Sequence, residues 1–214
     1  MRARDNPFTA QRVLEVRYRL SGITWDQLEE RLEALRFRAA LVGPHGHGKT
    51  TLLEDLGERL ASRGFRPRAI TLRQGERRLG PVRAAALFRD PGPRDLLLVD
   101  GAEQLDRLAW WSLRRRSRSA AGILVTSHEP GLLPTLHECR TSPDLLAAIL
   151  RDLLPKTMGE PMGEPPSPAE LFARHQGNLR DALRELYDHY SGMTEAGITS
   201  SPAARRGSRS PAGR

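Results

Sequence analysis

The stretch Arg38-Ala-Ala-Leu-Val-Gly43-Pro-His-Gly-His-Gly-Lys-Thr50 joins a short apolar run to a glycine-rich loop. The apolar run has the length and composition of a buried parallel strand. The loop satisfies the pattern G-x-x-x-x-G-K-[ST], which is the Walker A pattern of phosphate-binding loops. Leucines recur at helical spacing over residues 51–60, so a helix is predicted directly after the loop. A strand, a glycine-rich loop and a helix in this order form the context in which the pattern binds nucleotide phosphates.

Each residue type in the loop has a physical task in phosphate binding. Glycines let the backbone bend tightly, so that its N–H groups converge on a phosphate at the N-terminus of the following helix. The lysine reaches the β- and γ-phosphates, and the hydroxyl after it ligates Mg²⁺. The alternative for the loop is a glycine-rich turn that binds nothing. For the two histidines, exposed loop side chains are the alternative to metal ligands. We expect a nucleotide to bind at Gly43, Pro44, His45, Gly46, His47, Gly48, Lys49, Thr50 and Thr51.

A second carboxylate follows the apolar run Leu96-Leu-Leu-Val-Asp100. Asp100 is expected at the carboxyl end of a strand, where open α/β sheets bind ligands, and resembles the Walker B aspartate. It would hold Mg²⁺ through a bound water, with Thr50 as the other protein ligand; alternatively, it only caps the next helix. The next carboxylate, Glu103, could orient the attacking water if Gly101 permits a tight turn. It could equally be an acidic first-turn residue that favours a helix start.

Apolar runs along the rest of the chain alternate with segments of helical period. This alternation predicts an α/β fold, a three-layer sandwich with a mostly parallel sheet. The phosphate loop makes it a sheet of the P-loop NTPase type. A small helical segment follows the sheet. Strands are predicted at 38–43, 68–72, 95–100, 122–127 and 136–141, and helices at 24–35, 51–60, 82–88, 103–119 and 144–154.

The composition changes several times along the chain. A tandem repeat, Met158-Gly-Glu-Pro161 and Met162-Gly-Glu-Pro165, marks a linker that cannot hold a helix. A last helical stretch is expected beyond it, interrupted at Gly177. We predict an irregular lead-in at 1–22, a nucleotide-binding core at 23–141, a lid-like helical segment at 142–190 with a Pro/Gly linker at 155–168, and a disordered basic tail at 191–214.

The charge of the chain favours anionic partners without identifying them. The formal net charge is +8 and the sequence pI is about 10.8. Only Lys49 and Lys156 are lysines, and such an arginine skew is also what a GC-rich coding sequence produces. Nucleic acid is therefore one possible partner, through the tail arginines among others, and a solvated surface is the alternative. With a single cysteine, Cys139, no export signal and no apolar run long enough to span a membrane, we expect a soluble, cytoplasmic protein.

With these motifs in place, residues 24–190 resemble the AAA+ ATPases and their relatives among bacterial secretion and transposition helper ATPases. The phrases around the two motifs also resemble a group of small uncharacterised bacterial ATP-binding proteins. The resemblance implies that the strand Ile123-Leu-Val-Thr126-Ser127-His128 is a sensor-1 strand whose polar end contacts the γ-phosphate side of the site. Thr126 is the first choice for that role and Ser127 the second; an ordinary strand-end threonine is the alternative. The chain departs from the family at Gly101, where a glutamate commonly follows the Walker B aspartate.

By resemblance to the AAA+ ATPases, the helical segment after the sheet is a small helical lid. Gly177-Asn-Leu-Arg180-Asp-Ala-Leu183 is similar to the sensor-2 signature, in which an arginine of the lid reaches the γ-phosphate. Arg180 would have that role here, unless it is a surface arginine on an amphipathic helix. The arginines at 114–118 could supply an arginine finger to a neighbouring subunit, or they could form a solvated helix end.

Three functions are compatible with these motifs. The leading one is a Mg²⁺-dependent ATPase of AAA+-like type, with Glu103, Thr126 and Arg180 as catalytic residues, that couples nucleotide state to a conformational change. The alternative is a nucleotide-gated binding module with negligible hydrolysis, and a third is a small-molecule or nucleotide kinase. ATP is favoured over GTP because no Asn-Lys-x-Asp pattern occurs. The protein client and the oligomeric state are not set by the sequence.

Overall fold

The computed structural model describes residues 6–154 and 166–198. Its centre is a sheet of five strands in the order β2-β3-β4-β1-β5, and every neighbouring pair is parallel. One strand, β4, separates the strand before the phosphate loop (β1) from the strand that ends in Asp100 (β3). The predicted parallel sheet is confirmed, and the strands are β1 (Arg38–Val42), β2 (Arg66–Thr71), β3 (Asp95–Asp100), β4 (Gly122–Ser127) and β5 (Thr135–Glu138).

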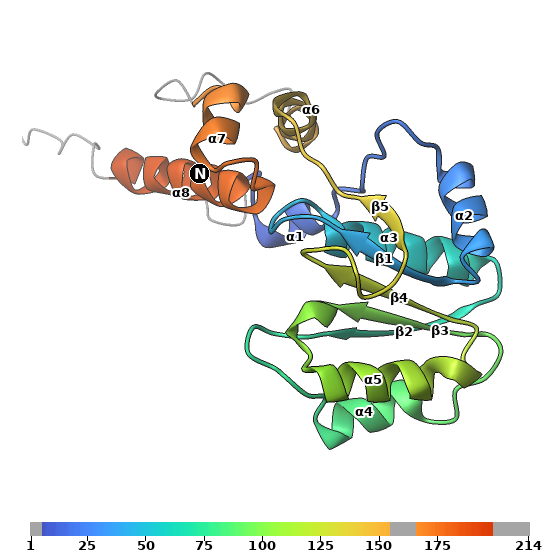
Figure 1. Ribbon diagram of the computed structural model, residues 1–214. Helices are drawn as coiled ribbons and strands as arrows, with labels where there is room; N and C mark the ends of the chain where they lie inside the picture. The colour runs from blue at the N-terminus through green and yellow to red at the C-terminus, as the bar shows by residue number, and fades with distance from the viewer. Residues whose placement is uncertain (1–5, 155–165, 199–214) are drawn as a thin grey trace, which may run out of the picture.

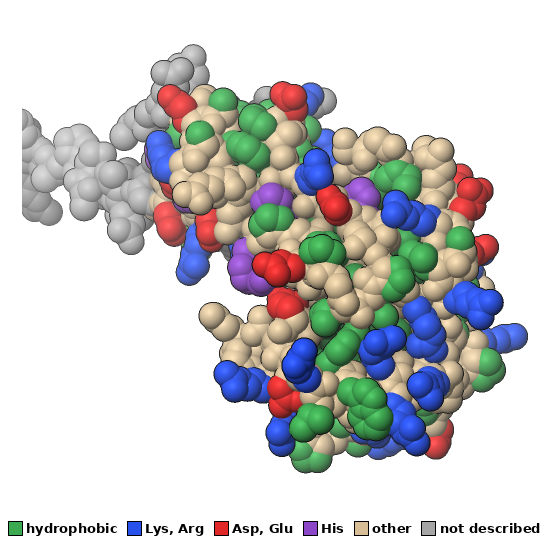
Figure 2. Space-filling view, viewed as in Figure 1, with side chains coloured by type: hydrophobic (Ala, Val, Ile, Leu, Met, Phe, Trp, Pro, Cys, Tyr) green, Lys and Arg blue, Asp and Glu red, His purple; other side chains and the backbone are tan. Residues whose placement is uncertain are grey.

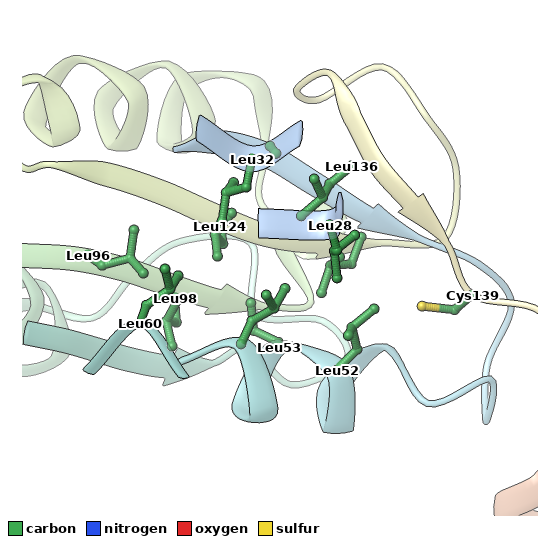
Figure 3. Packing of buried hydrophobic residues seen from close by; sticks show 13 residues of the cluster. Leu28, Leu32, Leu52, Leu53, Leu60, Leu96, Leu98, Leu124, Leu136 and Cys139 are labelled. Carbon is green, nitrogen blue, oxygen red and sulfur yellow. The ribbon is translucent and has the colours of Figure 1, made fainter. Parts of the chain in front are cut away.

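Helices cover both faces of the sheet, as the prediction of a three-layer sandwich requires (Figure 1). One face carries α2 (Trp25–Ala34) and α3 (Lys49–Ser62), and the other carries α4 (Pro81–Phe88) and α5 (Arg107–Arg116). Successive side chains of a strand point to opposite faces. In β3, Leu96 and Leu98 therefore pack into the first core cluster and Leu97 and Val99 into the second. The first cluster lies between the sheet, α2 and α3 (Figure 3).

A third cluster forms the helical unit at the side of the sheet, drawn yellow-brown to red in Figure 1. It comprises α6 (Pro143–Leu153), α7 (Pro168–Arg174) and α8 (Leu179–Ile198), which bury Leu146, Leu171 and Leu183 among others. The predicted interruption at Gly177 separates α7 from α8. Ser167 caps α7 with a capping box, because its hydroxyl accepts from the backbone N–H of Glu170 and Glu170 accepts from that of Ser167.

The two ends of the described chain contain helical structure outside the expected elements. The lead-in contains a short helix, α1 (Ala10–Leu14), and its Phe8 is buried against Tyr190 of α8, with ring centroids 5.3 Å apart. Asn6 donates to the carbonyl of Tyr187 (2.9 Å). At the other end, α8 continues to Ile198, past the expected end of the helix at 190. Residues 155–165 of the linker and 199–214 of the tail lie outside the described part of the chain.

The helix expected at 103–119 is divided into three pieces. A short 3-10 turn, η2 (Ala102–Gln104), precedes α5, and another, η3 (Ser117–Ser119), follows it. The break occurs at Leu105, whose backbone is extended, and Asp106 then caps α5 by accepting from the N–H of Ala109 (2.8 Å). Glu103 is therefore on the turn directly after β3 rather than in the helix. In the described part of the chain, no helix is both long enough and apolar enough to cross a bilayer.

Candidate nucleotide-binding site

The glycine-rich loop lies between β1 and α3, at the carboxyl edge of the sheet. Gly46 has a left-handed backbone (φ +72°), and a Cβ at this position would lie 1.8 Å from Oδ1 of Asn178. The residue is therefore a glycine for two reasons, its backbone conformation and the close approach of the lid. The loop ends at Gly48, and the first residue of α3 is Lys49. The backbone N–H groups at the start of α3 thus lie next to the loop, which is the arrangement that phosphate binding requires.

Lys49 has only 8% of its surface exposed. Its ammonium donates to the carbonyls of Gly43 (2.6 Å) and Pro44 (2.8 Å), which hold it across the loop. Burial lowers the pKa of Lys49, while the negative charges of Glu103 and Asp100 oppose that shift and the positive charge of Arg180 adds to it. These electrostatic effects place the carboxylates and Arg180 around the same ammonium group.

The hydroxyl of Thr50 and the carboxylate of Asp100 face each other across the loop. Thr50 Oγ1 donates to the two carboxylate oxygens at 3.0 and 3.2 Å. A hydroxyl and a carboxylate are hard oxygen donors of the kind that Mg²⁺ prefers, and Mg²⁺ sites in NTPases use few protein ligands. The chemistry of this donor pair therefore fits the predicted Mg²⁺. The two predicted ligands, Thr50 and Asp100, lie within hydrogen-bond distance of each other.

Thr126, the sensor-1 candidate, is fully occupied by protein contacts. Its hydroxyl donates to Asp100 Oδ1 (2.6 Å) and accepts from the N–H of Gly101 (2.7 Å), and the residue is 1% exposed. In this structure it therefore fixes the orientation of the Asp100 carboxylate rather than presenting a free hydroxyl. The second choice, Ser127, donates to the carbonyl of Glu129 (2.7 Å).

Glu103 extends from η2 toward the loop. Its Oε1 lies 3.3 Å from Nε2 of His128. Its Oε2 is buried without a hydrogen-bond partner among the described residues. An unpaired buried carboxylate oxygen is costly, and such atoms often belong to sites that engage a ligand or water. Gly101, at φ +81°, makes the tight turn that brings Glu103 back toward the site.

The two loop histidines contact different parts of the site. The His45 ring lies edge-on to His128, with centroids 3.8 Å apart, and His47 Nδ1 is 3.5 Å from the hydroxyl of Thr141. Burial lowers the pKa of His47. Over the described residues, no group of three or more His, Cys, Asp or Glu side chains is arranged to hold a metal ion.

The lid reaches the loop through the start of α8. Besides its contact with Gly46, Asn178 accepts from the N–H of Asp181 (3.2 Å) and so caps α8. Thr141 donates to the carbonyl of Gly177 (2.8 Å), which joins the end of the core to the same turn. Arg180 is exposed and follows Asn178 by two residues. Its positive charge contributes to lowering the pKa of Lys49.

Two residues of the site had no role in the sequence analysis. His128 directly follows β4, but its contact with Glu103 depends on a turn 25 residues earlier in the chain. Tyr18, from the lead-in, donates its N–H to Asp55 of α3 (2.7 Å) and lays its ring against Gly48, where a Cβ would lie 3.0 Å from the ring. Burial raises the pKa of Tyr18. Its position in a polar, arginine-rich stretch gave no signal of this contact.

Comparison with known proteins shows the fold. No family model and no curated protein matches the sequence. Among solved structures, the chain is similar to RuvB from Thermotoga maritima, a Holliday junction branch migration motor, with 20% identity and a TM-score of 0.51 over 80% of this chain and 62% of that one. A point mutant of the same protein gives 19% identity and a TM-score of 0.49 over 82% and 65%. At 20% identity this likeness shows the fold alone, and the predicted α/β fold with a parallel sheet of the P-loop NTPase type is confirmed. The chain spans less than two thirds of the RuvB chain.

Proposed function

We propose that this chain is a Mg²⁺-dependent ATPase of AAA+-like type that couples its nucleotide state to the position of the lid. The observation that carries the proposal is the convergence of Lys49, Thr50, Asp100 and Glu103 at one loop, which the start of α8 also contacts. These residues come from α3, β3 and η2, so their convergence is a property of the folded chain and not of one motif.

In the proposed mechanism, a water attacks the γ-phosphorus in line, and the bond to the oxygen that bridges the β- and γ-phosphates breaks to give ADP and phosphate. Lys49 would bind the β- and γ-phosphate oxygens, after exchanging its contacts with the loop carbonyls. Thr50 and Asp100 would hold Mg²⁺, which when bound neutralises charge on the phosphates. Thr126 would keep Asp100 in place, and Arg180 would bind the γ-phosphate from the lid.

Glu103 would orient the attacking water and accept its proton. Its unpaired Oε2 provides the acceptor, and His128 holds the other oxygen. A general base must come within hydrogen-bond reach of the proton that it accepts. The route from β3 through Gly101 and η2 offers a way for Glu103 to meet this requirement without a glutamate at position 101.

Coupling would run through the contact between the loop and the start of α8. A γ-phosphate held by the loop and by Arg180 would favour one position of the lid, and its release would remove that preference. ATP is proposed as the nucleotide, and a protein client or a nucleic acid as what the lid motion acts on. RuvB, which shares the fold, is described as a motor on branched DNA.

A nucleotide-gated binding module without turnover is the second candidate, because Gly101 offers no carboxylate directly after Asp100. Steady-state phosphate release from the wild type and from Glu103→Gln separates the two. We expect turnover in the wild type, a loss of roughly a hundredfold in Glu103→Gln, and an unchanged affinity for a fluorescent ATP analogue. Glu30→Gln, the same chemical change on the exposed side of α2, is the matched control and should keep wild-type turnover. A wild type that binds ATP but releases no phosphate would support the module.

A further inference from the structure

The helix α5 buries one stripe of side chains and exposes another. Leu113 is 1% exposed, and Trp110 packs against the second core cluster. Trp111, the next residue, is 64% exposed. Residues three and four apart share a side of a helix. The outward stripe, which we call the α5 face, therefore consists of Leu108, Trp111, Arg114, Arg115 and, one turn on in η3, Arg118.

The α5 face carries positive charge without counter-charge. Residues 107–118 contain five arginines and no acidic residue. Within the described residues, none of these arginines lies within ion-pair distance of a carboxylate. Arg115 instead lies over the Trp111 ring (5.8 Å to the centroid) and Arg116 over Phe88 (4.1 Å).

Two arginines on the opposite side of the sheet are paired with a carboxylate. Arg59 of α3 and Arg63, its C-cap, both bind Glu29 of α2, at 2.5 and 2.9 Å. A general excess of arginine would explain the number of arginines on α5. It does not explain why the arginines of α5 lack acidic partners such as Arg59 and Arg63 have. The acidic residue at the start of α5, Asp106, pairs with Arg78 instead. The arginines on the α5 face are therefore without local charge compensation.

A partly buried arginine beside the end of α5 adds to the charge. Arg38 of β1 donates to the carbonyl (3.0 Å) and the hydroxyl (3.2 Å) of Ser117, at the end of α5. Burial lowers the pKa of Arg38, and the charges of Arg114 and Arg118 lower it further. These like charges repel one another in the free protein, and an anionic partner would relieve that repulsion.

The α5 face is separate from the nucleotide site. It ends through η3 at Gly122, the start of β4, whereas the phosphate loop lies at the carboxyl ends of the parallel strands. Figure 2 shows Lys and Arg side chains gathered around exposed apolar ones where Figure 1 draws α5, with few acidic side chains among them. Both surfaces can therefore be occupied at once.

We propose that the α5 face binds a single strand of nucleic acid. Arg114, Arg115 and Arg118 would contact its phosphates, and a base would stack on Trp111. Proteins that bind single strands combine a basic track with exposed aromatic rings, and a base must be unpaired to stack in this way. An exposed indole flanked by guanidinium groups supplies both elements, whereas an acidic peptide would use the charges but would offer no flat ring to stack on Trp111.

The test is a fluorescence anisotropy titration of the full chain against a labelled oligothymidylate of ~15 nucleotides and against a duplex of the same length. The triple variant R114Q/R115Q/R118Q should weaken single-strand binding at least tenfold. It should also reduce the slope of log affinity against log salt by about two, because each phosphate contact on a single strand contributes about 0.7. Trp111→Ala should weaken single-strand binding at least fivefold and change duplex binding less than twofold.

The matched control is R205Q/R206Q/R209Q, which removes the same charge from the tail. It should change the affinity less than twofold, and all variants should bind the fluorescent ATP analogue as the wild type does, because none touches the loop. The proposal is overturned if the wild type shows no salt-dependent binding or if the tail variant loses as much affinity as the α5 variant. Equal binding of a polyglutamate chain, unaffected by Trp111→Ala, would also overturn it in favour of an acidic protein partner.

Discussion

At the scale of single residues, Gly101 explains the departure from the family pattern after Asp100. Its backbone is left-handed (φ +81°), and a Cβ would lie 2.9 Å from the carbonyl oxygen of Leu72. Any side chain here would meet backbone that cannot move aside, in a conformation that L-residues rarely adopt. A glutamate therefore does not fit at this position, and the next carboxylate along the chain is that of Glu103.

Restoring the family's residue should consequently do harm. Gly101→Glu is expected to lower the free energy of unfolding by about 1–3 kcal/mol and to leave phosphate release no faster than in the wild type. Chemical denaturation and steady-state turnover check the two parts. Gly101→Ala, which adds only the Cβ, should lose most of the same stability. A Gly101→Glu variant with wild-type stability and faster turnover would contradict this explanation.

His128 is expected to act on turnover by positioning Glu103. His128→Ala should lower kcat about tenfold, by loosening the carboxylate, with KM unchanged. His128→Gln, whose amide nitrogen can replace Nε2, should recover much of that loss. Adding His128→Ala to Glu103→Gln should have no further effect, because the two residues act as one unit. Independent, additive effects in the double variant would assign His128 a different role.

At the scale of elements, the start of α8 joins the lid to the phosphate loop. Asn178 is both the cap of α8 and the neighbour of Gly46, and Thr141 binds the carbonyl of Gly177 one residue earlier. The elements that meet here, the loop before α3 and the turn before α8, are both helix starts. A change in the position of α8 therefore changes the surroundings of the loop directly.

Removing this cap should weaken the lid. Asn178→Ala is expected to lower the free energy of unfolding by about 1 kcal/mol, because the N–H of Asp181 loses its acceptor. Hydrogen exchange should show the loss first in α8. Asn178→Ser keeps an oxygen at the cap without adding a charge beside Asp181, and should retain most of the stability. If Asn178→Ala and Asn178→Ser were equally stable, the cap would not be what holds the start of α8.

At the scale of the whole molecule, the N-terminal segment holds the core and the lid together. Arg17 binds Asp55 and Glu58 of α3, Arg19 pairs with Asp152 of α6, and Phe8 packs into the lid cluster. The segment thus contacts the core, the lid and, through Tyr18, the phosphate loop. A lid that moves with nucleotide state would have to move against these contacts.

The pH dependence of stability is also a property of the whole molecule. Burial lowers the pKa of His47, His128 and His137 below the ordinary 6.5. Below that pH the unfolded chain binds more protons than the folded one, so the free energy of unfolding should fall as the pH is lowered from about 7 to about 5. Urea denaturation across this range measures the effect, and His137→Gln should make it shallower. A free energy of unfolding that stayed constant or rose on acidification would contradict the lowered pKa values of these histidines.

The sequence alone determined the elements and the phosphate loop. The runs at 38–43 and 95–100 alternate between two buried faces, and the spacing of Gly43, Gly48, Lys49 and Thr50 is fixed by the backbone of one short loop. Both signals are local, because residues close in sequence share the geometry that produces them. Asp100 was also predictable, since the carboxyl ends of parallel strands meet at one edge of the sheet.

Only the tertiary structure decided how side chains from distant segments meet. The hydroxyl of Thr126 binds Asp100 of a neighbouring strand, His128 meets Glu103, and Asn178 touches Gly46. Phe8 is buried by a helix at the far end of the chain. Such contacts depend on how helices and strands pack, and the local pattern of a segment carries no record of its distant neighbours. The sequence therefore set the loop and its chemistry, and the packing of the sheet and lid set which groups surround it.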